Sequence, residues 1–180
     1  MWSKQKRGGV CIYIEITLAY SSRADLYDSN LEAIWIELLL QKNRLILIGA
    51  IYRPQHQGDF LDNFDKSMDG LPPDQEIYVF GDLNICDNNK TRLRIIYRNT
   101  LDTHGMNQII TSNTRLSKTP PLIDHIICNN HEKIAKHGVL DIGFNDHQIT
   151  FCTRKITKKQ FYETYHSLLK SKDWSSVYSN

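Results

Sequence analysis

Apolar positions in the first third of the chain recur in patterns typical of β-strands. Residues 9–16 are rich in β-branched and aromatic side chains, and residues 31–40 alternate as expected for a strand with one buried face. Residues 45–52 are nearly all apolar, as in a central strand that is covered on both faces. Between these strands, the polar residues 20–30 are expected to form a loop. The pattern therefore predicts three strands in this part of the chain.

Two later segments have the spacing of amphipathic helices. The first follows a possible capping residue, Asp59, and ends before Pro72, and the second spans about residues 91–103. Their inner faces are expected to carry Phe60, Leu61, Phe64 and Met68 in the first helix, and Leu93, Ile96, Tyr97 and Leu101 in the second. Further strands are predicted at residues 77–80, 107–110, 122–128, 138–140 and 148–153. This order favours an α/β (α+β) fold with two packed sheets over a regular βαβ repeat.

The bulk properties indicate one globular domain. The 180 residues, of which 41% are hydrophobic, suffice for a core, and we place the domain at residues 1–153. Residues 154–180 become polar and basic with a helical pattern, as expected for a linker or partner-docking segment. The net charge of +2 is too small to indicate nucleic-acid binding by itself, although basic residues cluster near both ends.

The sequence also predicts an intracellular protein (cytoplasm or nucleus) without a membrane partner. No apolar run reaches the roughly 18–20 residues of a membrane-spanning helix, and the first residues lack the apolar core of a secretion signal. Cysteines occur at four scattered positions without a Cys-x-x-Cys pair: Cys11, Cys86, Cys128 and Cys152. We expect free thiols, with a disulfide as the alternative.

Candidate chemistry is concentrated where polar residues adjoin predicted strands. Asp82 and Asn84 directly follow the strand at 77–80, Asp124 lies within an apolar run, and Asp146 and His147 precede the last strand. Acidic residues from separate strands are sufficient to bind Mg²⁺, which keeps several waters of its own. Because phosphodiester hydrolysis needs a cation, a group that orients water and groups that hold phosphate, this set indicates a metal-assisted phosphoryl-transfer site.

Asp124 and His147 are expected to form a pair. An unpaired buried carboxylate costs several kcal/mol, so Asp124 needs a partner, and His147 is the natural candidate. The carboxylate would fix the tautomer of the imidazole. The same residues also have structural interpretations: a Gly-Asp sequence after a strand is often a turn, and Tyr52 at the end of its strand is often a half-buried core residue.

A second constellation resembles a zinc site superficially. It consists of His125, Cys128 and His131, with His137 further along the chain. Strand alternation would send His125 and Cys128 to opposite faces, so we expect no zinc there.

Taken in order, several motifs resemble the endonuclease/exonuclease/phosphatase superfamily, and most closely the endonuclease domain of non-LTR (LINE-type) retrotransposons. They lie at residues 7–13, 33–37, 49–54, 81–84, 114–115, 122–126 and 145–147. The resemblance implies a two-sheet α/β/β/α sandwich, and it implies that the tail precedes a reverse transcriptase. It differs at Leu83, where the family usually has an aromatic residue, and at Asn145, where it usually has serine.

The resemblance also implies roles for individual residues. Asp82 would orient or activate the attacking water, and Asn84 would hold a phosphoryl oxygen. Asp124 would pair with His147, which would stabilise the transition state, and Asp146 would lie at the metal, Mg²⁺ or Mn²⁺. Contacts to the scissile phosphate and to DNA would come from Tyr52, Arg53, Thr114 and Arg115, the last two on a surface loop.

The family's first strands carry an Asn and a metal-ligand Glu, and we expect this chain to begin after them. The expected function is therefore Mg²⁺-dependent nicking of DNA, impaired by truncation. The alternative is an inactive fragment that at most binds nucleic acid. A phosphatase of lipids or inositol phosphates is a third possibility. Missing strands would also leave sheet edges and apolar surface exposed, which predicts self-association.

Overall fold

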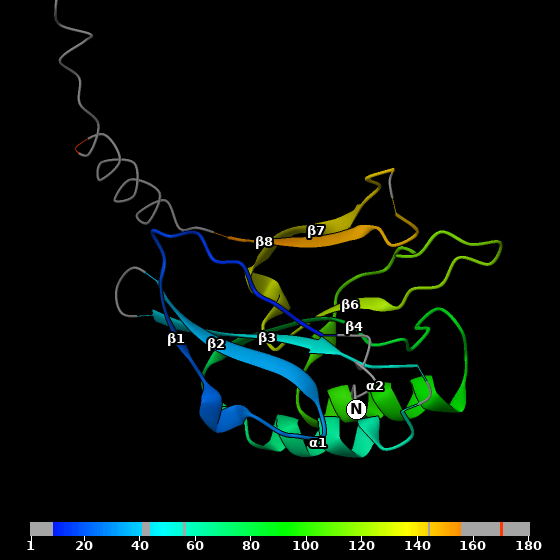
Figure 1. The fold of residues 1–180 in the computed structure, drawn as a ribbon, viewed down its shortest axis with the longest axis horizontal. Coiled ribbons are helices and arrows are strands. Elements are labelled where there is room, and N and C mark those ends of the chain that lie inside the picture. The colour runs from blue at the N-terminus through cyan, green and yellow to red at the C-terminus, as the bar shows by residue number, and fades with distance from the viewer. Residues whose placement is uncertain (1–8, 41–43, 56, 144, 156–169, 171–180) are drawn as a thin grey trace, which may run out of the picture.

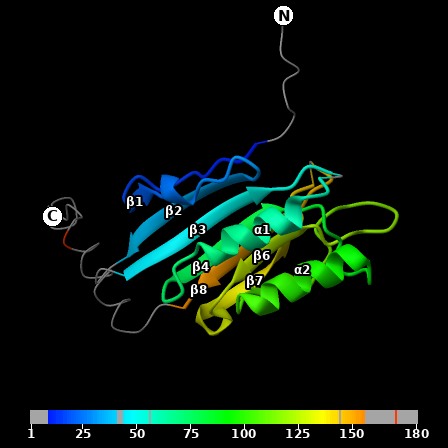
Figure 2. The ribbon, with the colours of Figure 1, turned by 90° about the horizontal axis from the view of Figure 1, so that it is seen from below.

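The computed structural model describes residues 9–40, 44–55, 57–143, 145–155 and 170. The described residues form three layers: two helices, a six-stranded sheet and a two-stranded sheet (Figure 1). Both helices lie on one face of the large sheet, and the small sheet lies on the other (Figures 1 and 2). The expected mixed α/β fold with two sheets is confirmed. Within the described part of the chain, no helix covers the small sheet.

The large sheet has the order β1-β2-β3-β4-β6-β5. Its strands are β1 (Ala19–Ser22), β2 (Glu32–Leu40), β3 (Arg44–Tyr52), β4 (Glu76–Asp82), β5 (Asn107–Gln108) and β6 (Asp124–Cys128). All neighbours are antiparallel except β3 and β4, which run parallel. The small sheet pairs β7 (Ile134–Leu140) with β8 (Ile149–Arg154), and two 3₁₀ turns complete the elements, η1 (Ala24–Leu26) and η2 (His131–Lys133).

The two helices cover the outer face of the large sheet because each has one apolar side. Helix α1 (Phe60–Asp69) supplies the crossover between the parallel strands β3 and β4. Helix α2 (Arg92–Thr103) is capped by Thr91, whose side-chain oxygen accepts a hydrogen bond from the Arg94 amide. All four residues predicted for the inner face of α1 are buried. In α2 the prediction fails at Ile96, which is 42% exposed. The helix instead packs on the sheet with the side that carries Tyr97 and Leu101.

Two apolar cores follow from the alternation of the central strands. One lies between the helices and the large sheet and contains Leu47, Ile51 and Phe64. The other lies between the two sheets and contains Ile46, Tyr78 and Ile126. Strand β3 contributes to both cores, as expected for a central strand covered on both faces.

An ion-pair cluster fastens the small sheet to the large one. Glu76, at the start of β4, accepts hydrogen bonds from Arg154 of β8, from Lys133 of η2 and from the Tyr78 hydroxyl. These contacts measure 2.6–2.9 Å. The Glu76 side chain is only 7% exposed, so its charge is neutralised inside the sandwich.

Two predictions about the first part of the chain are wrong. Residues 9–15 form no strand, and the side chains of Tyr13 and Ile16 are each 95% exposed. A strand needs a hydrogen-bonded neighbour, and the edge of β2 that could pair with these residues is occupied by β1. Most of β1 lies within residues 20–30, which were expected to form a loop. Apolar side chains remain exposed on the sheets, among them Ile34, Leu39 and Ile149.

The predicted helical linker at 154–180 falls almost wholly outside the described residues, as do the basic residues at the start of the chain. In the part that the structure describes, none of the helices has the length and apolar character needed to cross a membrane.

Candidate active site

Two carboxylates face each other at one end of the sandwich. Asp82 is the last residue of β4 and Asp124 is the first residue of β6, and the antiparallel register pairs them directly. Side chains alternate along a strand, so Asp82 lies on the same face as Tyr78, and Asp124 on the same face as Ile126, both of which pack between the sheets. The prediction that separate strands bring these two carboxylates together is therefore confirmed.

His147 reaches the pair from the segment that leads into β8. Its Nδ1 atom lies 3.1 Å from both carboxylate oxygens of Asp124, so the predicted contact between these residues is present. The second ring nitrogen, Nε2, is not used in this contact. An Nδ1–H that donates to Asp124 makes Nε2 an acceptor in the neutral ring and a donor in the protonated ring.

Asp82, Asp124 and His147 form a compact group that suits a cation. Each offers one ligand atom, and these atoms lie within 4.8 Å of one another. Burial raises the pKa of the Asp82 carboxyl, and the neighbouring charge of Asp124 raises this pKa further. A cation bound between the two carboxylates would neutralise the charge that raises the pKa of Asp82.

The loop after β4 is held in an unusual shape. Gly81 lies so close to β3 that a Cβ atom there would clash with the carbonyl oxygen of Ile51. Asn84 has a positive φ of 48°, a left-handed conformation that asparagine tolerates. The Asn84 amide donates to Asp82 Oδ1 at 3.1 Å, and its side chain donates to the Arg53 carbonyl at 2.9 Å. These contacts place Asn84 beside Asp82.

Arg53 has a structural role that the sequence did not suggest. It is 6% exposed, and its guanidinium donates to the carbonyls of Leu83, Asn84 and Gln57 at 3.2–3.3 Å. It also lies over the Phe60 ring, 5.7 Å from the centroid. Most of this side chain therefore faces the protein: Nη1 holds the loop that carries Asn84, Nη2 holds the Gln57 carbonyl, and the buried Nε has no hydrogen-bond partner among the described residues.

Tyr52 ends β3 next to the carboxylates. The amide of the following residue donates to the Asp82 carbonyl at 2.9 Å, so the chain at this point runs beside Asp82. Tyr52 shares the alternation of Ile46 and Ile48, which face the small sheet, and it is half-buried. This position fits a hydroxyl at the rim of the site.

Thr114 and Arg115 differ from each other in their surroundings. The prediction of a surface loop is wrong for Thr114, which is fully buried. Its hydroxyl oxygen accepts hydrogen bonds from the amides of Ile123 and Asp124. Arg115 is part-exposed and forms an ion pair with Asp146 at 2.7 Å. Its hydrogen bond lowers the pKa of the Asp146 carboxyl. Among the described residues, Asp146 does not belong to the compact group formed by Asp82, Asp124 and His147.

The zinc-like constellation does not form a site in the described residues. His125 is 1% exposed on the helix side, where it contacts the Tyr97 hydroxyl and the Ile85 carbonyl at 3.1 and 2.9 Å. Burial lowers the pKa of its imidazole to about 4. Cys128 packs in the core between the sheets, so the expected separation of these two residues onto opposite faces is confirmed.

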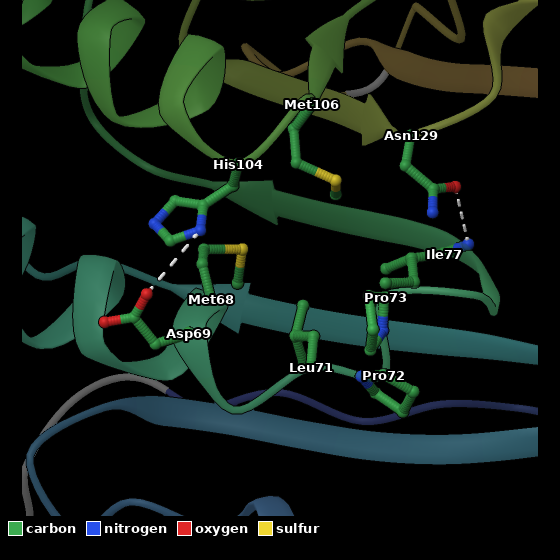
Figure 3. Close-up of a pocket in the computed structure, with 9 residues that line it drawn as sticks. All are labelled: Met68, Asp69, Leu71, Pro72, Pro73, Ile77, His104, Met106 and Asn129. Carbon is green, nitrogen blue, oxygen red and sulfur yellow. Dashed lines mark hydrogen bonds and ion pairs between the residues drawn. The ribbon is translucent and has the colours of Figure 1, made fainter.

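A separate pocket lies at the far end of β4, on the helix side (Figure 3). It measures about 200 Å³ and is lined mainly by apolar residues, with Met68 and Met106 on one side and Pro72 and Pro73 on the other. Two polar contacts lie among the lining residues: the Ile77 amide donates to Asn129 Oδ1 at 3.0 Å, and His104 Nδ1 lies 3.9 Å from Asp69 Oδ1. The pocket is remote from Asp82 along β4 and takes no part in the candidate active site.

Comparisons with solved structures support the fold. The endonuclease domain of TRAS1, a telomere-specific non-LTR retrotransposon, superposes with a TM-score of 0.68 at 13% identity, over 80% of this chain and 72% of that domain. An endonuclease/exonuclease/phosphatase family protein from Leptotrichia buccalis gives a TM-score of 0.54 at 14% identity, over 69% and 53%. A mannosyl-6-phosphatase from Bacteroides thetaiotaomicron gives 0.51 at 12% identity, over 78% and 66%. These likenesses establish the fold alone.

At the level of sequence, no curated protein matches the chain significantly. The Endonuclease/Exonuclease/phosphatase family profile matches residues 3–147, which include all the candidate site residues. The chain therefore belongs to the Endonuclease/Exonuclease/phosphatase family.

Proposed function

We propose that this protein is a metal-dependent phosphodiesterase that nicks DNA. The observation that carries the proposal is the gathering of Asp82, Asp124 and His147 within 4.8 Å at the end of the sandwich. The likeness to the TRAS1 endonuclease domain supports DNA as the substrate. We further propose, from the sequence motifs that resemble non-LTR retrotransposon endonucleases, that the protein acts inside the cell next to a reverse transcriptase.

In this proposal each residue has a role that fits its surroundings. Asp82 orients the attacking water, because burial and the charge of Asp124 raise the pKa of its carboxyl and make it a stronger base than an exposed aspartate. Asp124 holds His147 through Nδ1, which leaves Nε2 to donate to a phosphoryl oxygen when the ring is protonated. Asn84 and Tyr52 border the same site and bind the phosphate through neutral groups.

The donor set fits a divalent cation. Asp82 and Asp124 offer carboxylate oxygens, which suit Mg²⁺ and Mn²⁺, and His147 lies beside them with Nε2 left for the phosphate. The bound cation would neutralise charge that develops on the phosphate. Asp146 lies outside this group, and its Oδ2 is held by Arg115 at 2.7 Å.

The test is nicking of supercoiled plasmid DNA with Mg²⁺ or Mn²⁺, beside an EDTA control. We expect metal-dependent nicking that His147→Ala reduces at least about 100-fold, as loss of a charge-stabilising group does. His137→Ala, an exposed histidine of β7, is the matched control and should nick like the wild type. Folded protein that nicks no faster than His147→Ala would refute the proposal.

The second candidate is a protein that binds nucleic acid without cleaving it. It is favoured by the position of Asp146, which lies outside the compact group in the described residues and pairs with Arg115 instead. This function predicts retention of DNA in a salt-sensitive binding assay without any nicking.

A further inference from the structure

One short segment is hydrogen-bonded to both halves of the candidate site. On one side, the amides of Thr114 and Arg115 donate to the Pro121 carbonyl at 3.0 and 3.3 Å, next to the strand that carries Asp124. On the other side, the Gln148 amide donates to the Thr114 carbonyl at 2.8 Å. Arg115 also forms an antiparallel bridge with His147. Residues 114–115 therefore join the main chain of Asp124 to that of His147.

The side chain of Thr114 strengthens the first of these links. Its hydroxyl oxygen accepts from the Ile123 amide at 3.1 Å and from the Asp124 amide at 3.0 Å. A hydroxyl oxygen has two lone pairs, and both are used here. Thr114 is fully buried, so no water can replace this acceptor. The Thr114 hydroxyl therefore holds the Asp124 backbone from one side, while the pairing with β4 holds it from the other.

We propose that Thr114 is a positioning residue that sets the distance between the Asp124 carboxylate and the His147 imidazole. Its hydroxyl fixes Asp124, and its carbonyl fixes Gln148, the neighbour of His147. The contact of 3.1 Å between the two side chains follows from these two anchors. The catalytic part of the inference rests on the proposed function, whereas the positioning part concerns only the geometry of the pair.

Isosteric variants separate the hydroxyl from the volume that it fills. Thr114→Val keeps the shape and removes the acceptor, and Thr114→Ser keeps the acceptor and removes the methyl group. Thr100→Val is the matched control, because Thr100 is a buried threonine of α2 on the opposite side of the large sheet. Circular dichroism and urea unfolding establish that each variant is folded.

The first readout is independent of activity. In metal-free protein with ¹⁵N-labelled histidine, the Nδ1–H of His147 in its hydrogen bond to Asp124 gives a slowly exchanging signal, assigned by its loss in His147→Ala. We expect Thr114→Val to abolish this signal, and Thr114→Ser and Thr100→Val to retain it. Persistence of the signal in folded Thr114→Val, or its loss in Thr114→Ser, would overturn the proposal.

The second readout is the rate of nicking. Thr114→Val should lower kcat by about 10–100-fold with KM nearly unchanged, since a displacement of about 1 Å costs rates of this order. Thr114→Ser should recover kcat to within about threefold of the wild type, by the same estimate. If the wild type does not nick DNA at all, the proposed function fails while the histidine signal still decides the positioning role.

A folding defect in Thr114→Val does not remove the test. Thr114→Cys and Thr114→Ser have similar volumes, and sulfur is the weaker hydrogen-bond acceptor. The proposal then requires Thr114→Cys to lose the histidine signal that Thr114→Ser retains. Equal signals in these two folded variants would overturn it.

Discussion

The stability of this protein should fall steeply in acid because of one buried carboxylate, Glu76. Burial by itself raises the pKa of this carboxyl, but hydrogen bonds from Arg154, Lys133 and Tyr78 outweigh burial and lower the pKa to about 2. The ordinary value is 4.5. The folded-state pKa is thus depressed, so the stabilisation is fully present above the unfolded-state pKa and is lost as pH falls through the folded-state pKa.

The size of the effect follows from the difference in pKa. A shift of about two and a half pKa units corresponds to about 3 kcal/mol in the free energy of unfolding, at 1.36 kcal/mol per unit. The side chain is 7% exposed, so solvent screens this interaction little. We therefore expect the wild type to lose about 3 kcal/mol between pH 5 and pH 2 through this group, in addition to the smaller effects of exposed carboxylates.

Urea unfolding followed by circular dichroism at several pH values measures this loss. Glu76→Gln removes the charge but keeps the shape, so its free energy of unfolding should be lower at pH 7 and should depend less on pH between 5 and 2. Glu132→Gln, which changes an exposed carboxylate of η2, is the control and should follow the wild type. If Glu76→Gln and the wild type lose the same free energy in acid, the assignment of the acid sensitivity to this cluster is refuted.

Three further predictions concern the candidate active site. Gly81→Ala should destabilise the fold by about 2–4 kcal/mol in urea unfolding, because the added Cβ atom would clash with the Ile51 carbonyl. Gly70→Ala is the control: its Cβ atom would make only an ordinary van der Waals contact with the Ser67 carbonyl, so stability should change by less than about 1 kcal/mol. Arg53→Met should destabilise by about 2–4 kcal/mol in the same assay, since it leaves backbone carbonyls of the loop without a donor. Mn²⁺ at about tenfold its Kd should raise the melting temperature by roughly 2–4 °C at pH 7.5. This gain should shrink as pH falls through the raised pKa of Asp82, where protonation competes with the metal, and a shift that persists in Asp82→Asn would contradict this site.

The elements that the sequence predicted well are those defined by local patterns. Strands β2, β3 and β4 and both helices appear close to their predicted bounds, because apolar periodicity depends only on neighbouring residues. The contact between Asp124 and His147 was also predictable, although 23 residues separate them. A carboxylate in an apolar run needs a partner, and His147, just before the last predicted strand, was the natural candidate.

The failures occur where the outcome depends on contacts between distant segments. Residues 9–16 have the composition of a strand, but composition does not say whether a sheet edge is available to pair with them. Thr114 has no local signal for burial, and its partners lie nine and ten residues away in the chain. Arg53 follows a strand and precedes a proline. An arginine in this context can equally lie on the surface or be buried. The sequence does not show that Arg53 binds carbonyls of a loop 30 residues further along the chain.

The position of His147 relative to the two carboxylates is therefore a property of how the two sheets are joined. Asp82 and Asp124 belong to the large sheet, whereas His147 leads into β8 of the small one. The sheets are joined by polar contacts at both ends of β8, at Thr114 near its start and at Glu76 near its end. Strand β8 has six residues, a span of roughly 20 Å. Because close-packed interiors transmit strain, we expect Glu76→Gln to weaken the histidine signal as well as the stability of the protein.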